Sequence, residues 1–184
     1  MKNLTRLLVL ALAVLVAPAF AQKVRLATSA GDIVVELNAE KAPMSVENFL
    51  KYVRAGHYDG VIFHRVIDGF MIQTGGYRAD LSERPTRPPI TLEAGNGLSN
   101  VRGSIAMART SDPNSATAQF FINVKDNAFL NPSAQAPGYT VFGKVISGMD
   151  VVEKIRLTPT GPGGPFPTDV PKTPILINSA TLVN

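Results

Sequence analysis

The sequence contains no cysteine and no tryptophan, and only two of its 184 residues are histidines. The lack of cysteine excludes disulfides, cysteine-ligated zinc and thiol catalysis. His57 and His64 do not have the spacing of a zinc site, so we expect no bound metal. No GxSxG turn, Walker loop or GxGxxG motif follows a strand pattern, which argues against a familiar serine hydrolase and a nucleotide-binding enzyme. We expect a function without a cofactor.

Only one long hydrophobic run is present, and it lies at the N-terminus. Lys2 and Arg6 precede the run LLVLALAVLV, and Ala19-Phe20-Ala21 has the small-x-small pattern of a signal-peptidase site. We therefore assign residues 1–21 to a cleaved secretory signal peptide and expect a periplasmic or secreted protein; an uncleaved anchor is the alternative. Residues 22–184 then form the mature chain, and their number suits one domain.

The excess of positive charge is small. The formal net charge is +4, and loss of Lys2 and Arg6 with the signal peptide lowers it to +2. Arg78, Arg84 and Arg87 are interspersed with acidic residues, which is typical of a solvated loop rather than a nucleic-acid surface. We expect a monomer that binds no nucleic acid and, after processing, no membrane.

The dominant pattern in the mature chain is alternation of apolar and polar residues, which predicts β-strands. A first hairpin is predicted over residues 23–28 and 32–37, with inward positions at Val24, Leu26, Ile33, Val35 and Leu37. Further strands are predicted over residues 104–108, 118–124, 140–146 and 175–183, with a short one near 90–93. Seven or eight short strands in one domain favour a closed antiparallel barrel.

Two helices are expected to cap this barrel. The spacing i, i+3, i+4 and i+7 predicts an amphipathic helix between Pro43 and Gly56, with an apolar face of Val46, Phe49, Leu50 and Val53. A second, shorter helix is predicted over residues 149–155. The segment TPTGPGGPFPTDVPKTP, residues 158–174, is too rich in proline for a helix or an interior strand, so we predict an irregular excursion.

The stretch FHRVIDGFMIQTGG, residues 63–76, predicts another hairpin, because β-favouring residues flank Asp68-Gly69. Its first arm carries Arg65, an unusual residue in an apolar strand. A strict two-residue turn pairs Arg65 with Ile72, whereas an extra loop residue or bulge at Phe70 pairs it with Gln73. We predict the second register.

Amide and guanidinium donors lie among large apolar residues in several motifs. Taken singly, an arginine is more often a surface ion-pair partner and an apolar residue more often part of the core. Their combination indicates a groove beside an arginine. Phe120 is expected to point into the barrel and Phe121 outward, because neighbours on a strand face opposite sides, and His64 is expected to be structural.

On these motifs the sequence resembles the cyclophilins, which are peptidyl-prolyl cis-trans isomerases. The motifs, as they stand here, are FHRVIDGFMIQTGG, GSIAMART, SATAQFFIN, NAFLNP and YTVFGKVISGMDVVEKI. The likeness covers essentially the whole mature chain and is greatest to bacterial periplasmic members. It implies a closed eight-stranded antiparallel β-barrel capped by two α-helices, with a substrate groove on its outer surface.

The resemblance also implies roles for single residues. Arg65 matches the catalytic arginine. The substrate-binding positions it implies are the proline pocket and the strip that holds the peptide backbone, formed by Phe70, Met71, Gln73, Ala108, Arg109, Gln119, Phe121, Phe129, Leu130 and Tyr139. Phe129 and Tyr139 stand where eukaryotic members usually have tryptophan and histidine. The missing indole N–H predicts weak cyclosporin binding.

We therefore expect an isomerase that accelerates Xaa-Pro isomerisation during folding of exported proteins, with proline-containing unfolded or partly folded polypeptides as partners. Twisting the amide frees a lone pair on the proline nitrogen, and Arg65 can donate to it. A peptide-binding module or chaperone that uses the same groove without catalysis is the alternative. A carbohydrate-binding barrel would need exposed tryptophans, and the sequence has none.

Overall fold

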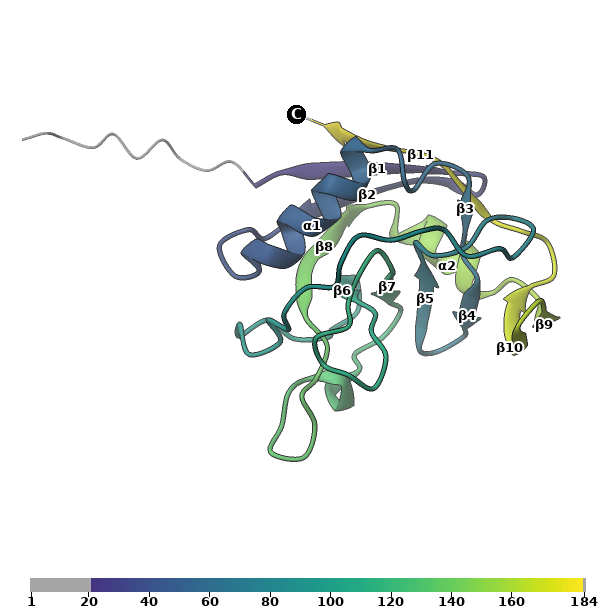
Figure 1. The fold of residues 1–184 in the computed structure, drawn as a ribbon. Coiled ribbons are helices and arrows are strands. Elements are labelled where there is room, and N and C mark those ends of the chain that lie inside the picture. The colour runs from purple at the N-terminus through teal and green to yellow at the C-terminus, as the bar shows by residue number, and fades with distance from the viewer. Residues whose placement is uncertain (1–20, 184) are drawn as a thin grey trace, which may run out of the picture.

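A single curled antiparallel sheet organises residues 21–183, the part of the chain that the computed structural model describes. The predicted signal peptide lies outside these residues apart from Ala21. Figure 1 shows strands β1, β2 and β11 crossing above β4 to β7. The strands are β1 (Lys23–Thr28), β2 (Gly31–Leu37), β3 (Val61–Ile62), β4 (Arg65–Ile67), β5 (Met71–Thr74), β6 (Ser104–Met107), β7 (Phe120–Asn123), β8 (Val141–Ser147) and β11 (Leu176–Val183).

The sheet curls into a barrel shape, and its two edge strands are adjacent in sequence. Its nine strands within the described residues follow the order β3-β11-β1-β2-β8-β6-β7-β5-β4, so β3 and β4 are the edge strands. Only Phe63 and His64 separate these two strands in sequence. If β3 and β4 are counted as one interrupted strand, eight strands surround the core. The predicted mainly β fold is therefore confirmed, but β3 and β4 share no ladder, so complete closure of the barrel is not shown. Across this gap β3 contacts the segment after β5, through the hydrogen bond from Ile62 N to Tyr77 O at 2.9 Å and an isolated bridge between Val61 and Arg78.

The inner face of the sheet carries the main core. All five inward positions predicted for the first hairpin are at most 2 % exposed. Phe120 also points inward, as predicted, and its ring centroid lies 5.3 Å from those of Phe49 and Tyr58. Phe142 packs against Phe49 at the same distance. Aromatic side chains thus fill the middle of the barrel and fix the spacing between the sheet and the first helix.

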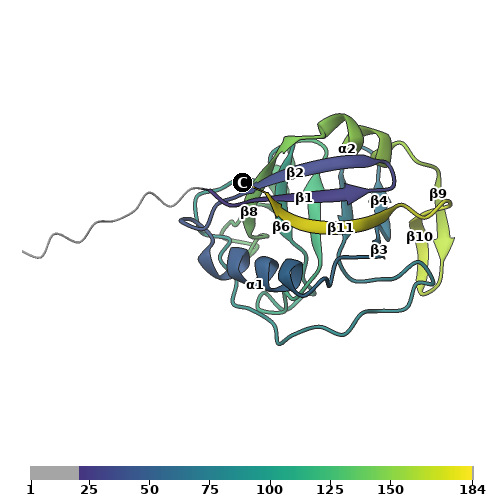
Figure 2. The same ribbon diagram turned by 90° about the horizontal axis from the view of Figure 1, so that it is seen from above.

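Two helices cover different sides of the barrel, and Figure 2 shows them on opposite sides of β1, β2 and β11. Helix α1 (Pro43–Arg54) buries the predicted face of Val46, Phe49, Leu50 and Val53. Helix α2 (Met149–Arg156) buries Val151, Val152 and Ile155. Both predicted helices are confirmed.

Residues 158–174 were predicted to be irregular, and this prediction is wrong. They contain a two-stranded hairpin of β9 (Thr160–Gly163) and β10 (Phe166–Pro171). Each strand has only one partner, so a proline can turn its missing N–H to the side that has no neighbouring strand. Gly164, with φ of +50°, allows the tight reversal.

The prediction of a short strand near residues 90–93 is also wrong, because only an isolated bridge joins Ile90 to Ala116. Glu93 instead caps helix α1, which has no side-chain cap at its own N-terminus. Its carboxylate accepts hydrogen bonds from Met44 N at 3.0 Å, Ser45 N at 2.8 Å and Ser45 Oγ at 2.7 Å. A negative charge at a helix N-terminus is favourable, so this loop is fastened to the helix.

We predict that Glu93→Ala lowers the free energy of unfolding by about 1 to 2 kcal/mol, because two helix N–H groups lose their acceptor. Urea titrations measure the change. Glu40→Ala is the control: the Glu40 side chain is 87 % exposed and lies 3.9 Å from its nearest cation, Lys41. This control should change stability by less than about 0.5 kcal/mol. Equal effects of the two substitutions would contradict the capping role.

Candidate functional site

The hairpin of β4 and β5 has the predicted register. Arg65 lies opposite Gln73, and Ile67 lies opposite Met71. The loop between them, residues 68–70, has three residues, and Phe70 N donates to Ile67 O at 3.1 Å. Gly69 takes φ of +66°, which glycine adopts without strain. The extra residue Phe70 therefore sets Arg65 and Gln73 on the same face.

This register starts a row of side chains across the outer face of the barrel. Gln73 pairs with Phe121 on β7, Phe121 with Ala106 on β6, and Ala106 with Val141 on β8. Neighbouring strands lie about 4.8 Å apart, so the row leads from a charged group to an apolar surface over a short distance. Phe121 faces outward, as predicted, while Ile122 beside it belongs to the inner core.

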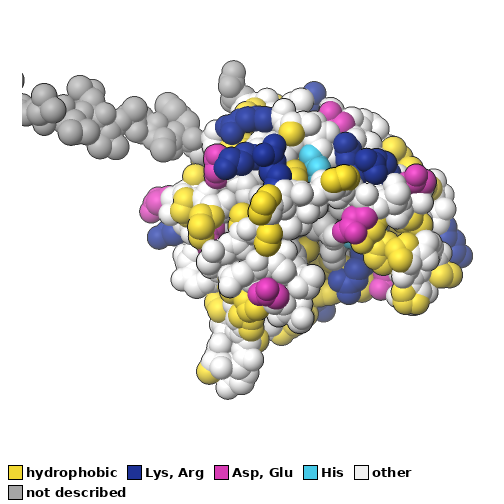
Figure 3. Space-filling model, viewed as in Figure 1, with side chains coloured by type: hydrophobic (Ala, Val, Ile, Leu, Met, Phe, Trp, Pro, Cys, Tyr) yellow, Lys and Arg dark blue, Asp and Glu magenta, His cyan; other side chains and the backbone are white. Residues whose placement is uncertain are grey.

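The apolar end of the row is the floor of a second hydrophobic cluster, separate from the barrel core. It consists of buried Met71, Ala106, Ala108, Phe121, Leu130 and Val141, with Ile67, Phe70, Leu98 and Tyr139 partly buried around them. Figure 3 shows that the surface over β5 and β7 is hollowed. Six of the residues implied by the family resemblance thus lie together: Phe70, Met71, Ala108, Phe121, Leu130 and Tyr139.

Phe129 lies at the rim rather than in the cluster. It belongs to a single 3₁₀ turn, η1 (Ala128–Leu130), and is 68 % exposed. Its ring stacks on Phe70 with centroids 5.5 Å apart, while Tyr139 packs edge-on against Phe121 at 5.7 Å. The two aromatic contacts extend the apolar wall on both sides of the hollow.

A chain of amides connects Arg65 to the hollow. Arg65 Nη1 donates to Gln73 Oε1 at 3.4 Å, and Gln73 Nε2 donates to Gln119 Oε1 at 2.9 Å. Gly76 makes room for Gln119, since a Cβ on this glycine would lie 2.7 Å from the Gln119 amide. The ion pairs recorded between residues 21 and 183 do not include Arg65. Its guanidinium therefore has donors available for a group in the hollow.

Arg109 lies at the other end of the cluster, after Ala108. Its Nε and Nη2 donate to Gly138 O at 3.1 and 2.9 Å, and its guanidinium carbon lies 4.4 Å from the centre of the Tyr139 ring. Both ends of the hollow thus carry a guanidinium group.

Three buried asparagines beneath the hollow were not singled out from the sequence. Asn127 Nδ2 donates to Asn123 Oδ1 at 2.7 Å and to Phe70 O at 2.9 Å. Asn123 Nδ2 donates to Asn100 Oδ1 at 3.1 Å. Asn100 Nδ2 in turn donates to Leu130 O at 3.2 Å and Tyr139 O at 3.3 Å.

These bonds tie the backbone of three wall residues to one network. Buried polar groups are costly unless they are paired, so the network holds the segments around Phe70, Leu130 and Tyr139 in one arrangement. One signal could have found it: asparagine is depleted in strands, yet Asn123 ends the otherwise apolar strand FFIN.

His64 is buried behind the amide chain and is 2 % exposed. Its ring packs against Tyr77 at 4.7 Å and against Phe166 of β10 at 5.5 Å. Burial, assisted by the nearby charge of Arg65, lowers the pKa of His64 to about 4. The histidine is therefore neutral at pH 7 and serves in packing.

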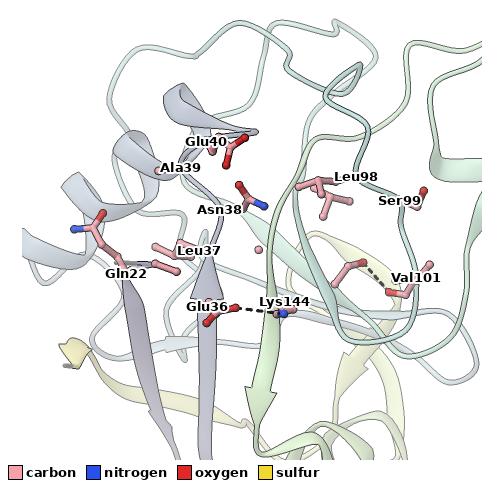
Figure 4. Close-up of a pocket in the computed structure, with 14 residues that line it drawn as sticks. Gln22, Glu36, Leu37, Asn38, Ala39, Glu40, Leu98, Ser99, Val101 and Lys144 are labelled. Carbon is pink, nitrogen blue, oxygen red and sulfur yellow. Dashed lines mark hydrogen bonds and ion pairs between the residues drawn. The ribbon is translucent and has the colours of Figure 1, made fainter. Parts of the chain in front are cut away.

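Another hollow, of about 1000 Å³, lies where residues 36–40, 98–101 and β8 meet, and it borders the second cluster at Leu98 and Val141. Figure 4 shows Leu37, Leu98 and Val101 in its wall and the ion pair between Glu36 and Lys144, whose charged atoms are 3.3 Å apart. The lysine of this hollow is paired with a carboxylate, whereas Arg65, one residue along the cross-strand row from Gln73, has no carboxylate partner within residues 21–183. Within residues 21–183 no helix is long and apolar enough to cross a membrane, and no group of three or more potential metal ligands occurs.

Comparison with known proteins points to one family. The family model described as "Cyclophilin type peptidyl-prolyl cis-trans isomerase/CLD" matches residues 23–182. The chain is 57 % identical over 163 residues to a peptidyl-prolyl cis-trans isomerase of Streptomyces antibioticus, covering 87 % of this chain and 98 % of that one. It is 54 % identical over 158 residues to peptidyl-prolyl cis-trans isomerase B of Escherichia coli, covering 84 % of this chain and 96 % of that one.

A solved structure gives the same answer for the fold. The chain superposes with a TM-score of 0.73 on a cyclophilin-type peptidyl-prolyl cis-trans isomerase of Cryptosporidium parvum solved in the presence of the dipeptide Ala-Pro. Sequence identity is 28 %, and the match covers 89 % of this chain and 99 % of the other.

We predict that His64 makes the protein less stable in acid. Its pKa is near 4 in the folded state and 6.5 in the unfolded chain, so the unfolded state binds more protons between these values. Stability falls as the pH drops from about 7 to 4, by roughly 3 kcal/mol from this group. Urea titrations at several pH values measure the loss, which should be smaller by about that amount in His64→Phe. An equally steep loss in this variant would disprove the assignment.

Proposed function

Because this chain belongs to the cyclophilin-type peptidyl-prolyl cis-trans isomerases, we propose that the hollow over Phe121 binds the proline ring of an Xaa-Pro bond and that Arg65 stabilises the twisted amide. The protein is a peptidyl-prolyl cis-trans isomerase. The site assignment rests on the guanidinium of Arg65, which has no carboxylate partner within residues 21–183 and lies in one cross-strand row with Gln73 and the apolar floor.

The reaction needs a donor and a shaped pocket rather than a nucleophile. Rotation about an Xaa-Pro bond has a barrier of about 18 to 20 kcal/mol because it breaks amide resonance, and no covalent bond is cleaved. In the twisted state the proline nitrogen becomes pyramidal and gains a lone pair that can accept a hydrogen bond. A donor aimed at this nitrogen binds the twisted state better than either planar state. Arg65 has the charge for this role, and within residues 21–183 only its Nη1 makes a side-chain hydrogen bond, to Gln73.

One hydrogen bond does not account for the whole effect. Millisecond turnover requires an acceleration of about 10⁴- to 10⁵-fold, or roughly 5.5 to 7 kcal/mol. A charge-assisted hydrogen bond contributes about 1.5 to 3 kcal/mol. We assign the remainder to the pocket of Phe70, Met71, Phe121 and Leu130, which grips the ring and excludes water, and to Gln119, Ala108 and Arg109, which hold the peptide backbone.

The N-terminal sequence supports an exported enzyme. Residues 1–21 have the pattern of a secretory signal peptide, and the absence of cysteine suits an oxidising compartment. We propose that the mature protein works in the periplasm or outside the cell, on proline-containing segments of exported polypeptides. One chain supplies every residue of the proposed groove, so catalysis needs no second subunit, and we propose that the protein acts as a monomer.

We predict that Arg65→Ala slows catalysed cis-trans exchange by about tenfold to hundredfold, which corresponds to loss of one charge-assisted hydrogen bond. Exchange NMR on a short Xaa-Pro peptide measures the rate at equal enzyme concentration. Arg65→Lys should retain part of the rate because it keeps the charge but not the planar fork. Arg78→Ala, which removes an exposed arginine bonded to Ser82 and Glu83, is the control. Unchanged exchange in folded Arg65→Ala would refute the proposed role.

We predict weak binding of cyclosporin, because Phe129 has no N–H to donate. Its exposed ring offers only stacking and apolar contact. Phe129→Trp adds an indole donor and should tighten binding by about threefold to tenfold, as expected for one net hydrogen bond. Calorimetry measures the affinity, and Phe129→Leu, which has no donor, is the control. Equal affinities for the tryptophan and leucine variants would argue against this explanation.

A further inference from the structure

Two arginines flank the hollow, one on each side of Phe121. Arg65 lies on the β5 side, where Gln73 stands between it and Phe121 in the cross-strand row. Arg109 lies on the β6 side, where the ring of Tyr139 stands between its guanidinium and Phe121. A peptide whose proline rests on Phe121 must pass between two positive charges.

The guanidinium of Arg109 is fixed by neutral partners. Its three nitrogens donate to the backbone carbonyls of Gly138 and Thr110, with distances between 2.8 and 3.1 Å. The Tyr139 ring supplies a cation–π contact. Carbonyl groups and an aromatic face hold the side chain in place without cancelling its charge, so the position of this charge is set before a peptide arrives.

Neither arginine has a carboxylate partner in the part of the chain that the structure describes. Asp112 is the acidic residue nearest to Arg109 in sequence, and its carboxylate accepts a hydrogen bond from Asn114 N in its own turn. The remaining walls of the hollow are apolar side chains and amides. Charges of one sign beside apolar walls are weakly screened and act on a ligand over several ångströms.

We propose that this site selects prolines by the charge of their neighbours: it isomerises Xaa-Pro bonds flanked by Asp or Glu faster than bonds flanked by Lys or Arg, and Arg109 is the residue that determines this preference. Arg65 also contributes positive potential to the hollow, but its proposed role is to donate to the reacting amide. The inference rests on the proposed function and specifies its substrate class.

The test compares charged peptides within one enzyme variant. Exchange NMR gives kcat/KM for Ac-Ala-Glu-Pro-Phe-amide, its Lys and Gln counterparts, and the series in which the charged residue follows proline. In wild type at low salt we expect the Glu peptide of at least one series to exceed the Lys peptide by about threefold to tenfold. The ratio of kcat/KM for the Glu peptide to that for the Lys peptide should approach one in Arg109→Gln. The same is expected for wild type in 1 M NaCl, where the Debye length falls to about 3 Å.

Arg25→Gln is the matched control, since it removes the same charge from β1, where Arg25 pairs with Asp32 at 3.6 Å. Its Glu-to-Lys ratio should equal that of wild type. A ratio near one for wild type in both series, or a ratio that survives Arg109→Gln, overturns the inference while leaving the proposed function intact. Absence of catalysed exchange for every peptide, the Gln peptides included, overturns both.

Discussion

The site depends on one register: Arg65 opposite Gln73 in the hairpin of β4 and β5. Side chains on a strand alternate between faces, so a slip of one residue on β4 would turn Arg65 into the barrel core and Val66 out to the solvent. The extra loop residue Phe70 prevents that slip. The same residue supplies a wall of the hollow, and its carbonyl is held by Asn127. Phe70 thus determines both the face toward which the Arg65 side chain points and the shape of the hollow beside it.

The two faces of the sheet serve different purposes: the inner face stabilises the fold, and the outer face carries the proposed binding site. Its inner face carries a continuous apolar core, whereas the proposed substrate site uses the outer face of the same strands. Apolar residues on an outer face need support from behind and from the sides, and this support is polar here: three asparagines join segments that are distant in sequence. The asparagine hydrogen bonds therefore hold the loops around the outer face in place, so that its apolar residues remain exposed to a ligand.

Periodicity predicted the fold well wherever a strand or helix has one buried face. It placed the first hairpin, both helices and the opposite directions of Phe120 and Phe121. It failed for residues 158–174, because proline excludes a central strand but not a two-stranded hairpin. It failed near residue 93 because Glu93 bonds to a helix 48 residues away. Periodicity did not predict the asparagine network either: the polar Asn123 in the strand FFIN is a local signal, but its partner Asn100 lies 23 residues away. The roles of the site residues came from the family resemblance.

We propose that Arg65 acts on the twisted amide and that its hydrogen bond to Gln73 positions it there, and a double-mutant cycle separates these two roles. Exchange NMR at saturating peptide should be measured for wild type, Arg65→Ala, Gln73→Ala and the double variant. If Gln73 acts through Arg65, the double variant is about as slow as Arg65→Ala alone, because the glutamine has nothing left to position. If the two losses multiply, the residues act independently and Gln73 does not position Arg65.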